Sequence, residues 1–152
     1  GESDYLSSLK EKYKPEERIH FTGHSDNPIN WINIFDAGLL PTTYPSESLP
    51  TVIIEYLYCN LPVIASDAGE INNMTGQGIN PAGIIIPIFE GKVDITSYAE
   101  AMKLYLTDKT LYTRHKTNSS ICYLMFDMDK CVEAYTDVYR QAHKQQATNK
   151  GI

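Results

Sequence analysis

Residues 44–66, YPSESLPTVIIEYLYCNLPVIAS, form the most informative pattern in the chain. A Pro/Ser-rich turn leads into TVIIEYLYCN, which is predicted to be a helix because apolar residues continue around most of it. Asn60 can end this helix in left-handed backbone. LPVIAS then has the unbroken apolar character of a strand that is buried on both faces. Turn, helix and buried strand in succession are typical of a parallel sheet covered by helices.

The same alternation of strands and helices continues through most of the chain. We expect Ser3 or Asp4 to cap the first helix, Asp94 to cap a later one, and one helical turn to lie within the Gly-rich loop 67–78. The fold class is therefore α/β, with a Rossmann-like parallel sheet flanked by helices. The other expected elements are helices 4–13, 29–37, 94–108, 109–117 and 129–146, and strands 18–23, 38–43 and 82–88.

The composition argues against several classes of function. The 152 residues carry a net charge of −6, so a nucleic-acid partner held by broad phosphate contacts is not expected. Three widely spaced cysteines form no C-x-x-C pair, and no His, Asp and Glu residues have metal-site spacing, so we expect no bound metal. The same cysteine pattern suggests no disulfide framework and favours a reducing cytoplasmic location. No apolar run reaches membrane-spanning length and no signal peptide opens the chain.

Two acidic residues, Glu47 and Glu55, flank the start of the central helix. Ligands of parallel sheets bind in the loops that follow strands, and the free N–H groups at a helix start attract phosphates. If the helix begins at Pro50 or Thr51, Glu47 could accept hydrogen bonds from sugar hydroxyls and Glu55 could accept two from a ribose diol. Spacing alone leaves open the alternative that both glutamates are ordinary surface residues.

The extended segment ESLPTVIIEYLYCNLPVIASDAGEI resembles the signature of glycosyltransferase family 4. RIHFTG and FDMDKCVEAYTDVY are similar to the family's V-x-F-x-G strand and its last helix, so the resemblance covers residues 1–140. Glu70 and Asn73 depart from it, because they stand where glycine and glutamate are common. The positions that follow the family pattern are Glu47, Leu49, Pro50, Val52, Glu55, Pro62, Val63, Ile64, Ala65, Ser66 and Gly69.

The resemblance implies the C-terminal, donor-binding half of a retaining glycosyltransferase with the GT-B fold. Residues 1–146 would form that domain and residues 147–152 a disordered tail. The first strands and an N-terminal acceptor domain would precede the chain, and the isolated domain would be inactive. Glu47 matches the catalytic glutamate near the transferred sugar. The residues matched to binding of the donor are Ser48, Leu49, Pro50, Thr51, Val52, Glu55 and, in the turn near the nucleobase, His24.

The expected donor is a UDP- or GDP-sugar, with no other cofactor, and the expected acceptor is a glycan or a lipid-linked molecule. Bacterial surface polysaccharide synthesis (O-antigen, capsule or lipopolysaccharide) is the expected pathway. Full-length protein could then lie at the inner face of the cytoplasmic membrane, although no membrane contact is evident in this domain. The alternatives are a non-catalytic Rossmann-like nucleotide-binding or scaffolding module, or a GT-B sugar-nucleotide epimerase.

Several other side chains are expected to have structural roles. Trp31 is predicted to lie in the core with its neighbours on the same helix. His115 and His143 are predicted to be solvated on Lys-rich helical faces, and the tyrosines of YTDVY, Tyr135 and Tyr139, to pack the final helix.

Overall fold

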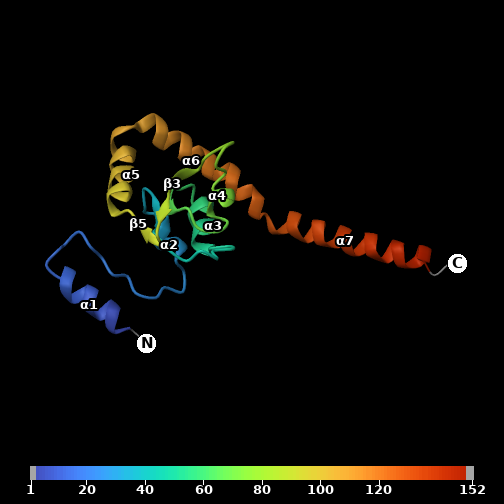
Figure 1. The fold of residues 1–152 in the computed structure, drawn as a ribbon, viewed down its shortest axis with the longest axis horizontal. Helices are drawn as coiled ribbons and strands as arrows, with labels where there is room; N and C mark the ends of the chain where they lie inside the picture. Colours follow the sequence, from blue (N-terminus) through green and yellow to red (C-terminus); the bar gives the residue numbers. More distant parts are fainter. Residues whose placement is uncertain (1–2, 150–152) are drawn as a thin grey trace.

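A three-stranded parallel sheet forms the centre of the computed structural model, which describes residues 3–149 (Figure 1). The strands are β1 (Gly38–Leu40), β2 (Val63–Ser66) and β3 (Gly83–Ile86), and they pair in the order β1-β2-β3. Their register pairs Leu39 with Ile64 and Ile64 with Ile84. The α/β class with a parallel sheet flanked by helices is thus confirmed.

The helices follow the strands as βαβ connections require. A short antiparallel hairpin, β4 (Ile88–Phe89) with β5 (Lys92–Val93), lies between β3 and the next helix and was not predicted. The predicted helical turn in the Gly-rich loop is present as α4. The helices are α1 (Asp4–Tyr13), α2 (Ile29–Ile32), α3 (Thr51–Tyr58), α4 (Ile71–Met74), α5 (Ile95–Thr107), α6 (Lys109–Tyr123), the 3-10 helix η1 (Leu124–Phe126) and α7 (Met128–Asn149).

Strand β2 is apolar on both faces because helices cover both faces. Successive side chains of a strand point in opposite directions. Val63 and Ala65 pack in the cluster that contains α3, whereas Ile64 packs with Tyr98 of α5 on the other face. All four residues of β2 are buried, which explains why LPVIAS carries no exposed polar position.

The predicted caps are confirmed. The Ser3 side chain accepts a hydrogen bond from the Leu6 N–H, and Asp94 accepts hydrogen bonds from the first N–H groups of α5. Asn60 has a φ of 57°, so the chain leaves α3 through left-handed backbone and turns directly into β2.

The predicted strand at residues 18–23 is wrong. This segment is irregular, and its apolar members Ile19 and Phe21 are exposed. A strand requires a neighbour for its N–H and C=O groups, and in the described part of the chain β1, β2 and β3 pair only with one another. The predicted helix 29–37 is also too long, because α2 ends at Ile32, and strands 38–43 and 82–88 shorten to β1 and β3.

Helix α7 is longer than predicted and does not pack along its length. It extends away from the sheet (Figure 1), and Tyr135 and Tyr139 are 65% and 68% exposed. The expectation that these tyrosines pack the helix is therefore wrong within this chain. The helix continues to Asn149, so residues 147–149 are helical, while the rest of the predicted tail, residues 150–152, lies outside the described residues.

His115 is buried, contrary to the predicted solvated position, whereas His143 is exposed as expected. The His115 ring lies on the side of α6 that faces α5, with its Nδ1 2.9 Å from the Tyr105 hydroxyl. Burial, together with the neighbouring Arg114, lowers the pKa of His115 below its ordinary 6.5. The pair therefore joins α5 to α6 with a neutral imidazole.

We expect the chain to lose stability on acidification through His115. Because the folded pKa lies below 6.5, the unfolded chain takes up this proton first as the pH falls. The stabilisation is complete above about pH 6.5 and is lost as the pH falls to the folded pKa. The free energy of unfolding, measured with urea at several pH values across this range, should fall as the pH falls. His115→Gln should remove this slope, and His143→Gln, at an exposed site, should retain it. A slope unchanged in His115→Gln would contradict the assignment.

Candidate functional site

The loop between β1 and α3 holds Glu47 in a fixed position. Thr42 follows the end of β1 by two residues, and its hydroxyl donates a hydrogen bond of 3.0 Å to Glu47 Oε1. The same hydroxyl accepts a hydrogen bond of 3.1 Å from the Tyr44 N–H. Glu47 is half-buried, so its carboxylate is oriented by the loop while part of it remains open to solvent.

A second loop, after β2, closes against the first. The Glu70 N–H donates a hydrogen bond of 2.8 Å to the Glu47 carbonyl oxygen. Gly69 has a φ of +51°, and a Cβ at this position would collide with the Glu47 backbone. Only glycine therefore allows the two loops to approach this closely. The hydrogen bond from Glu70 to Glu47 thus connects the loop that follows β1 to the loop that follows β2, at the carboxyl end of the sheet.

Helix α3 begins at Thr51 directly after the Glu47 loop, with Pro50 as its N-cap. The N–H groups of Thr51 and Val52 precede the first helical hydrogen bond. The Ile53 N–H is not free, because it donates a hydrogen bond of 3.0 Å to the Pro50 carbonyl oxygen. The start of α3 nevertheless lies beside the Glu47 loop, so the positive end of the helix dipole points toward that loop.

A cavity of about 340 Å³ brings the predicted base and ribose residues together. The turn at Gly23 and His24 lines one part of it, and Glu55 and Val52 from α3 line another. Trp31 also lines this cavity and is 45% exposed, so its predicted place in the core is wrong. The neighbouring residue Ile32 lies in the core instead of Trp31. The sequence INWINIF contains both residues and gives no signal of which one faces the cavity.

The remaining predicted residues lie in neighbouring hollows around the start of α3. Ser48 and Leu49 line a hollow of about 230 Å³ together with Glu70 and Asn73, whose amide donates a hydrogen bond of 2.7 Å to Glu70. Thr51 and Glu55 line a third hollow, of about 350 Å³, on the outer side of α3. The structure thus brings His24, Val52 and Glu55 into one cavity and places the other predicted residues beside it.

The charge of Glu55 affects its own helix. Burial raises the pKa of the Cys59 thiol and of the Tyr56 phenol, and the negative Glu55 raises both further. His24 is exposed, and its Nε2 lies 3.4 Å from Asp26. A carboxylate on one wall and a polar turn on the other provide hydrogen-bond acceptors and donors for a polar ligand.

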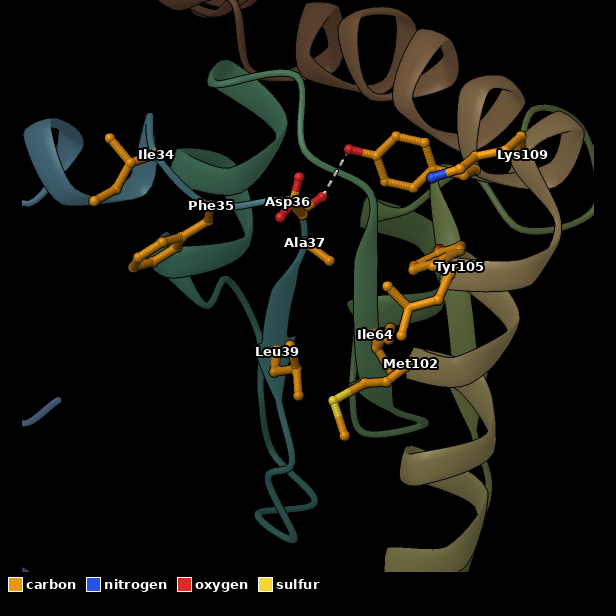
Figure 2. Close-up of a pocket in the computed structure, with 11 residues that line it drawn as sticks. Ile34, Phe35, Asp36, Ala37, Leu39, Ile64, Met102, Tyr105 and Lys109 are labelled. Carbon is orange, nitrogen blue, oxygen red and sulfur yellow. Dashed lines mark hydrogen bonds between the residues drawn. The ribbon is translucent and has the colours of Figure 1, made fainter. Parts of the chain in front are cut away.

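A separate cavity of about 640 Å³ lies against the face of the sheet that α5 covers and extends past the amino end of β1 (Figure 2). Asp36 and Ala37, just before β1, face Tyr105 and Lys109 across it, and the Tyr112 hydroxyl donates a hydrogen bond of 3.1 Å to the Asp36 carbonyl oxygen. Its lining is mainly apolar. Ligands of parallel sheets bind at the carboxyl ends of the strands, so this cavity is not the candidate site.

Residues 3–149 contain neither a cluster of metal ligands nor a membrane-spanning helix. No group of three or more His, Cys, Asp or Glu side chains is arranged to hold a metal ion there. None of the helices in this range combines the length and the apolar character needed to cross a membrane.

Comparisons with known proteins agree with this architecture. The chain resembles sucrose-phosphate synthase from Thermosynechococcus elongatus (20% identity, TM-score 0.69, 92% of this chain and 34% of that one). It also resembles Alr3699/HepE from Anabaena in complexes with UDP (21% identity, TM-score 0.76, 91% and 37%) and with UDP-glucose (21%, 0.72, 93% and 38%).

The chain therefore spans little more than a third of the length of these structures, and at this identity they show a shared fold. No curated protein matches it. The family model for glycosyl transferases group 1 matches residues 1–120. This range includes α3 and the two site loops, residues 41–50 after β1 and residues 67–70 after β2. The chain belongs to the glycosyl transferases group 1 family.

Proposed function

We propose that this chain is the nucleotide-sugar-binding domain of a retaining, hexosyl-transferring glycosyltransferase. The observation that carries the proposal is the arrangement around the start of α3. Glu55 shares a cavity with the Gly23–His24 turn, and the loop that precedes the helix presents Glu47. Resemblance to glycosyltransferase family 4 and the UDP-glucose complex of Alr3699/HepE support this choice of ligand.

We assign a part of the donor to each feature of this arrangement. The nucleoside would occupy the cavity between His24 and Glu55, where the carboxylate can accept both hydroxyls of a ribose. The diphosphate would lie against the N–H groups of Thr51 and Val52 at the positive end of α3. The sugar would then extend toward Ser48, Leu49 and Glu47.

Glu47 would act by positioning the sugar and stabilising positive charge in an oxocarbenium-like transition state. The Thr42 hydroxyl and the Glu70 N–H fix the loop in advance, so little reorganisation is needed during transfer. In the retaining mechanism the leaving phosphate would help to deprotonate the acceptor on the same face of the sugar.

The acceptor side of the reaction requires a second domain. We place residues 1–146 in the donor domain and a glycan or lipid-linked acceptor in an N-terminal domain of the complete polypeptide. The exposed edge of β1, where Leu39 is 37% exposed and lines the cavity of about 640 Å³, could pair with a preceding strand. Cytoplasmic location and a role in O-antigen, capsule or lipopolysaccharide synthesis rest on the family resemblance.

Calorimetry with UDP-, GDP- and ADP-sugars on the complete polypeptide tests the proposal. Binding of one class of nucleotide sugar, followed by transfer of its sugar with retained anomeric configuration, is the expected result. Binding without transfer to any acceptor would favour a non-catalytic module, and isomerised free nucleotide sugar would indicate an epimerase. No binding to any nucleotide sugar would refute the proposed function.

We expect Glu55→Ala to weaken nucleotide-sugar binding about ten- to a hundredfold, because charged hydrogen bonds to two hydroxyls are lost. Calorimetry with the 2′-deoxy nucleotide should show a smaller loss in this variant than in the wild type. Glu100→Ala, which removes an exposed glutamate from α5, is the matched control and should bind normally. Equal affinities of wild type and Glu55→Ala would remove Glu55 from the site.

A further inference from the structure

We propose that Tyr98 is a positioning residue for the proposed transfer reaction, and that its hydroxyl holds the two site loops together from beneath the sheet. The inference rests on the proposed function only for its effect on turnover. Its structural part concerns contacts between the ends of β1 and β2 and can be tested separately. Tyr98 is outside the family signature and lies on α5, far from the site loops in sequence.

The Tyr98 hydroxyl contacts the last residue of β1 and the last residue of β2. It donates a hydrogen bond of 3.2 Å to the carbonyl oxygen of Leu40, which ends β1. Its oxygen lies 2.8 Å from the hydroxyl of Ser66, which ends β2. A phenol has one proton, so Tyr98 donates to Leu40 and Ser66 donates to Tyr98. Tyr98 is only 5% exposed and Ser66 is fully buried, so the bond between them is buried, while the bond to Leu40 is part-buried.

Each of these strand ends leads directly into a site loop. Two residues after Leu40, Thr42 holds the carboxylate of Glu47. Four residues after Ser66, the Glu70 N–H holds the carbonyl oxygen of Glu47. The contacts therefore form a closed ring. Tyr98 contacts both strand ends, each strand end leads into a loop, and the two loops meet at Glu47. Release of the Tyr98 hydroxyl should let the strand ends, and with them the loops, shift relative to each other.

Tyr105, on the same helix α5, provides a matched control for Tyr98. This tyrosine is also 5% exposed, but its hydroxyl lies at the opposite end of β2. There it donates a hydrogen bond of 3.4 Å to the Val63 carbonyl oxygen and lies 2.9 Å from His115 Nδ1. Tyr98→Phe and Tyr105→Phe remove the same atom from the same helix. Only Tyr98→Phe removes it from the carboxyl end of the sheet.

Amide hydrogen exchange on this chain tests the structural part. The Glu70 amide reports the contact between the loops directly, because its N–H donates to Glu47. Tyr98→Phe should accelerate exchange at Glu70 about tenfold, as expected for the loss of about one net hydrogen bond. Tyr105→Phe should leave exchange at Glu70 unchanged, because its hydroxyl contacts the carbonyl oxygen of Val63 at the other end of β2. Equal exchange of Glu70 in Tyr98→Phe and the wild type would overturn the proposal.

Turnover in the complete polypeptide tests the functional part. Tyr98→Phe should lower kcat about tenfold with little change in KM for the nucleotide sugar, since the bound donor is misaligned with Glu47. Ser66→Ala should lower kcat in the same direction, and its effect should not add to that of Tyr98→Phe. Normal kcat with accelerated Glu70 exchange would overturn the positioning role. Failure of the wild type to bind any nucleotide sugar would refute the proposed function and leave the exchange result standing.

Discussion

Glu47→Ala should reduce sugar transfer by the complete polypeptide about a hundredfold or more, with nucleotide affinity almost unchanged. The loss has this size because a preorganised charge beside the reacting centre contributes several kcal/mol to the transition state. In the proposed arrangement Glu47 stands on the sugar side of the helix start, and its hydrogen bond to Thr42 would hold it before the donor arrives. Steady-state kinetics and calorimetry on the same preparations separate the two effects.

Two further variants refine the interpretation of Glu47. Glu47→Gln can keep the hydrogen bond to Thr42 and the shape of the loop but removes the negative charge, so a similar loss of kcat would assign the effect to charge. Glu90→Ala removes an exposed glutamate between β4 and β5 and should be fully active. Full activity of both Glu47 variants would show that this carboxylate has no part in the reaction.

Gly69→Ala should abolish most activity by separating the site loops. The new methyl group would meet the Glu47 backbone, and the φ of +51° adds strain for any residue with a Cβ. We expect a loss of about 1–3 kcal/mol in unfolding free energy and a fall in turnover at least as large as that of Tyr98→Phe. Urea unfolding and kinetics measure the two effects.

Gly78→Ala is the matched control for this variant. Gly78 also has a positive φ, of 90°, but a Cβ there would meet no atom within 4 Å. It should therefore share the backbone strain of Gly69→Ala without affecting the loops or turnover. If the two variants lost stability and activity equally, the close approach of Gly69 to Glu47 would have no special importance.

The parts of the fold that could be predicted are those with strong local signals. The unbroken apolar run of β2, the caps at Ser3 and Asp94, and the left-handed Asn60 each follow from local chemistry. Apart from the hairpin of β4 and β5, the order of strands and helices in residues 38–107 follows from their alternation. The position of Glu47 and Glu55 around the start of α3 also follows, because a loop between a strand and a helix must lie at the carboxyl edge of the sheet.

The errors occurred where tertiary contacts decide the outcome. Residues 18–23 have the composition of a strand, but they have no paired neighbour among the described residues. Trp31 and Ile32 are adjacent apolar residues, and only packing against α3 determines that Ile32 is buried and Trp31 lines the cavity. His115 is surrounded in sequence by Arg114 and Lys116, and its burial depends on Tyr105 of another helix.

A titration of this chain with UDP, followed by the indole N–H resonance of Trp31, tests the central claim most directly. Trp31 is the only tryptophan, it lines the same cavity as Glu55, and chemical shifts detect even weak binding. We predict a saturable shift of this resonance that is strongly reduced in Glu55→Ala and retained in Glu100→Ala. An indole resonance that does not move with UDP or with other nucleoside diphosphates, while the chain stays folded, would contradict the assignment of this cavity to the nucleotide.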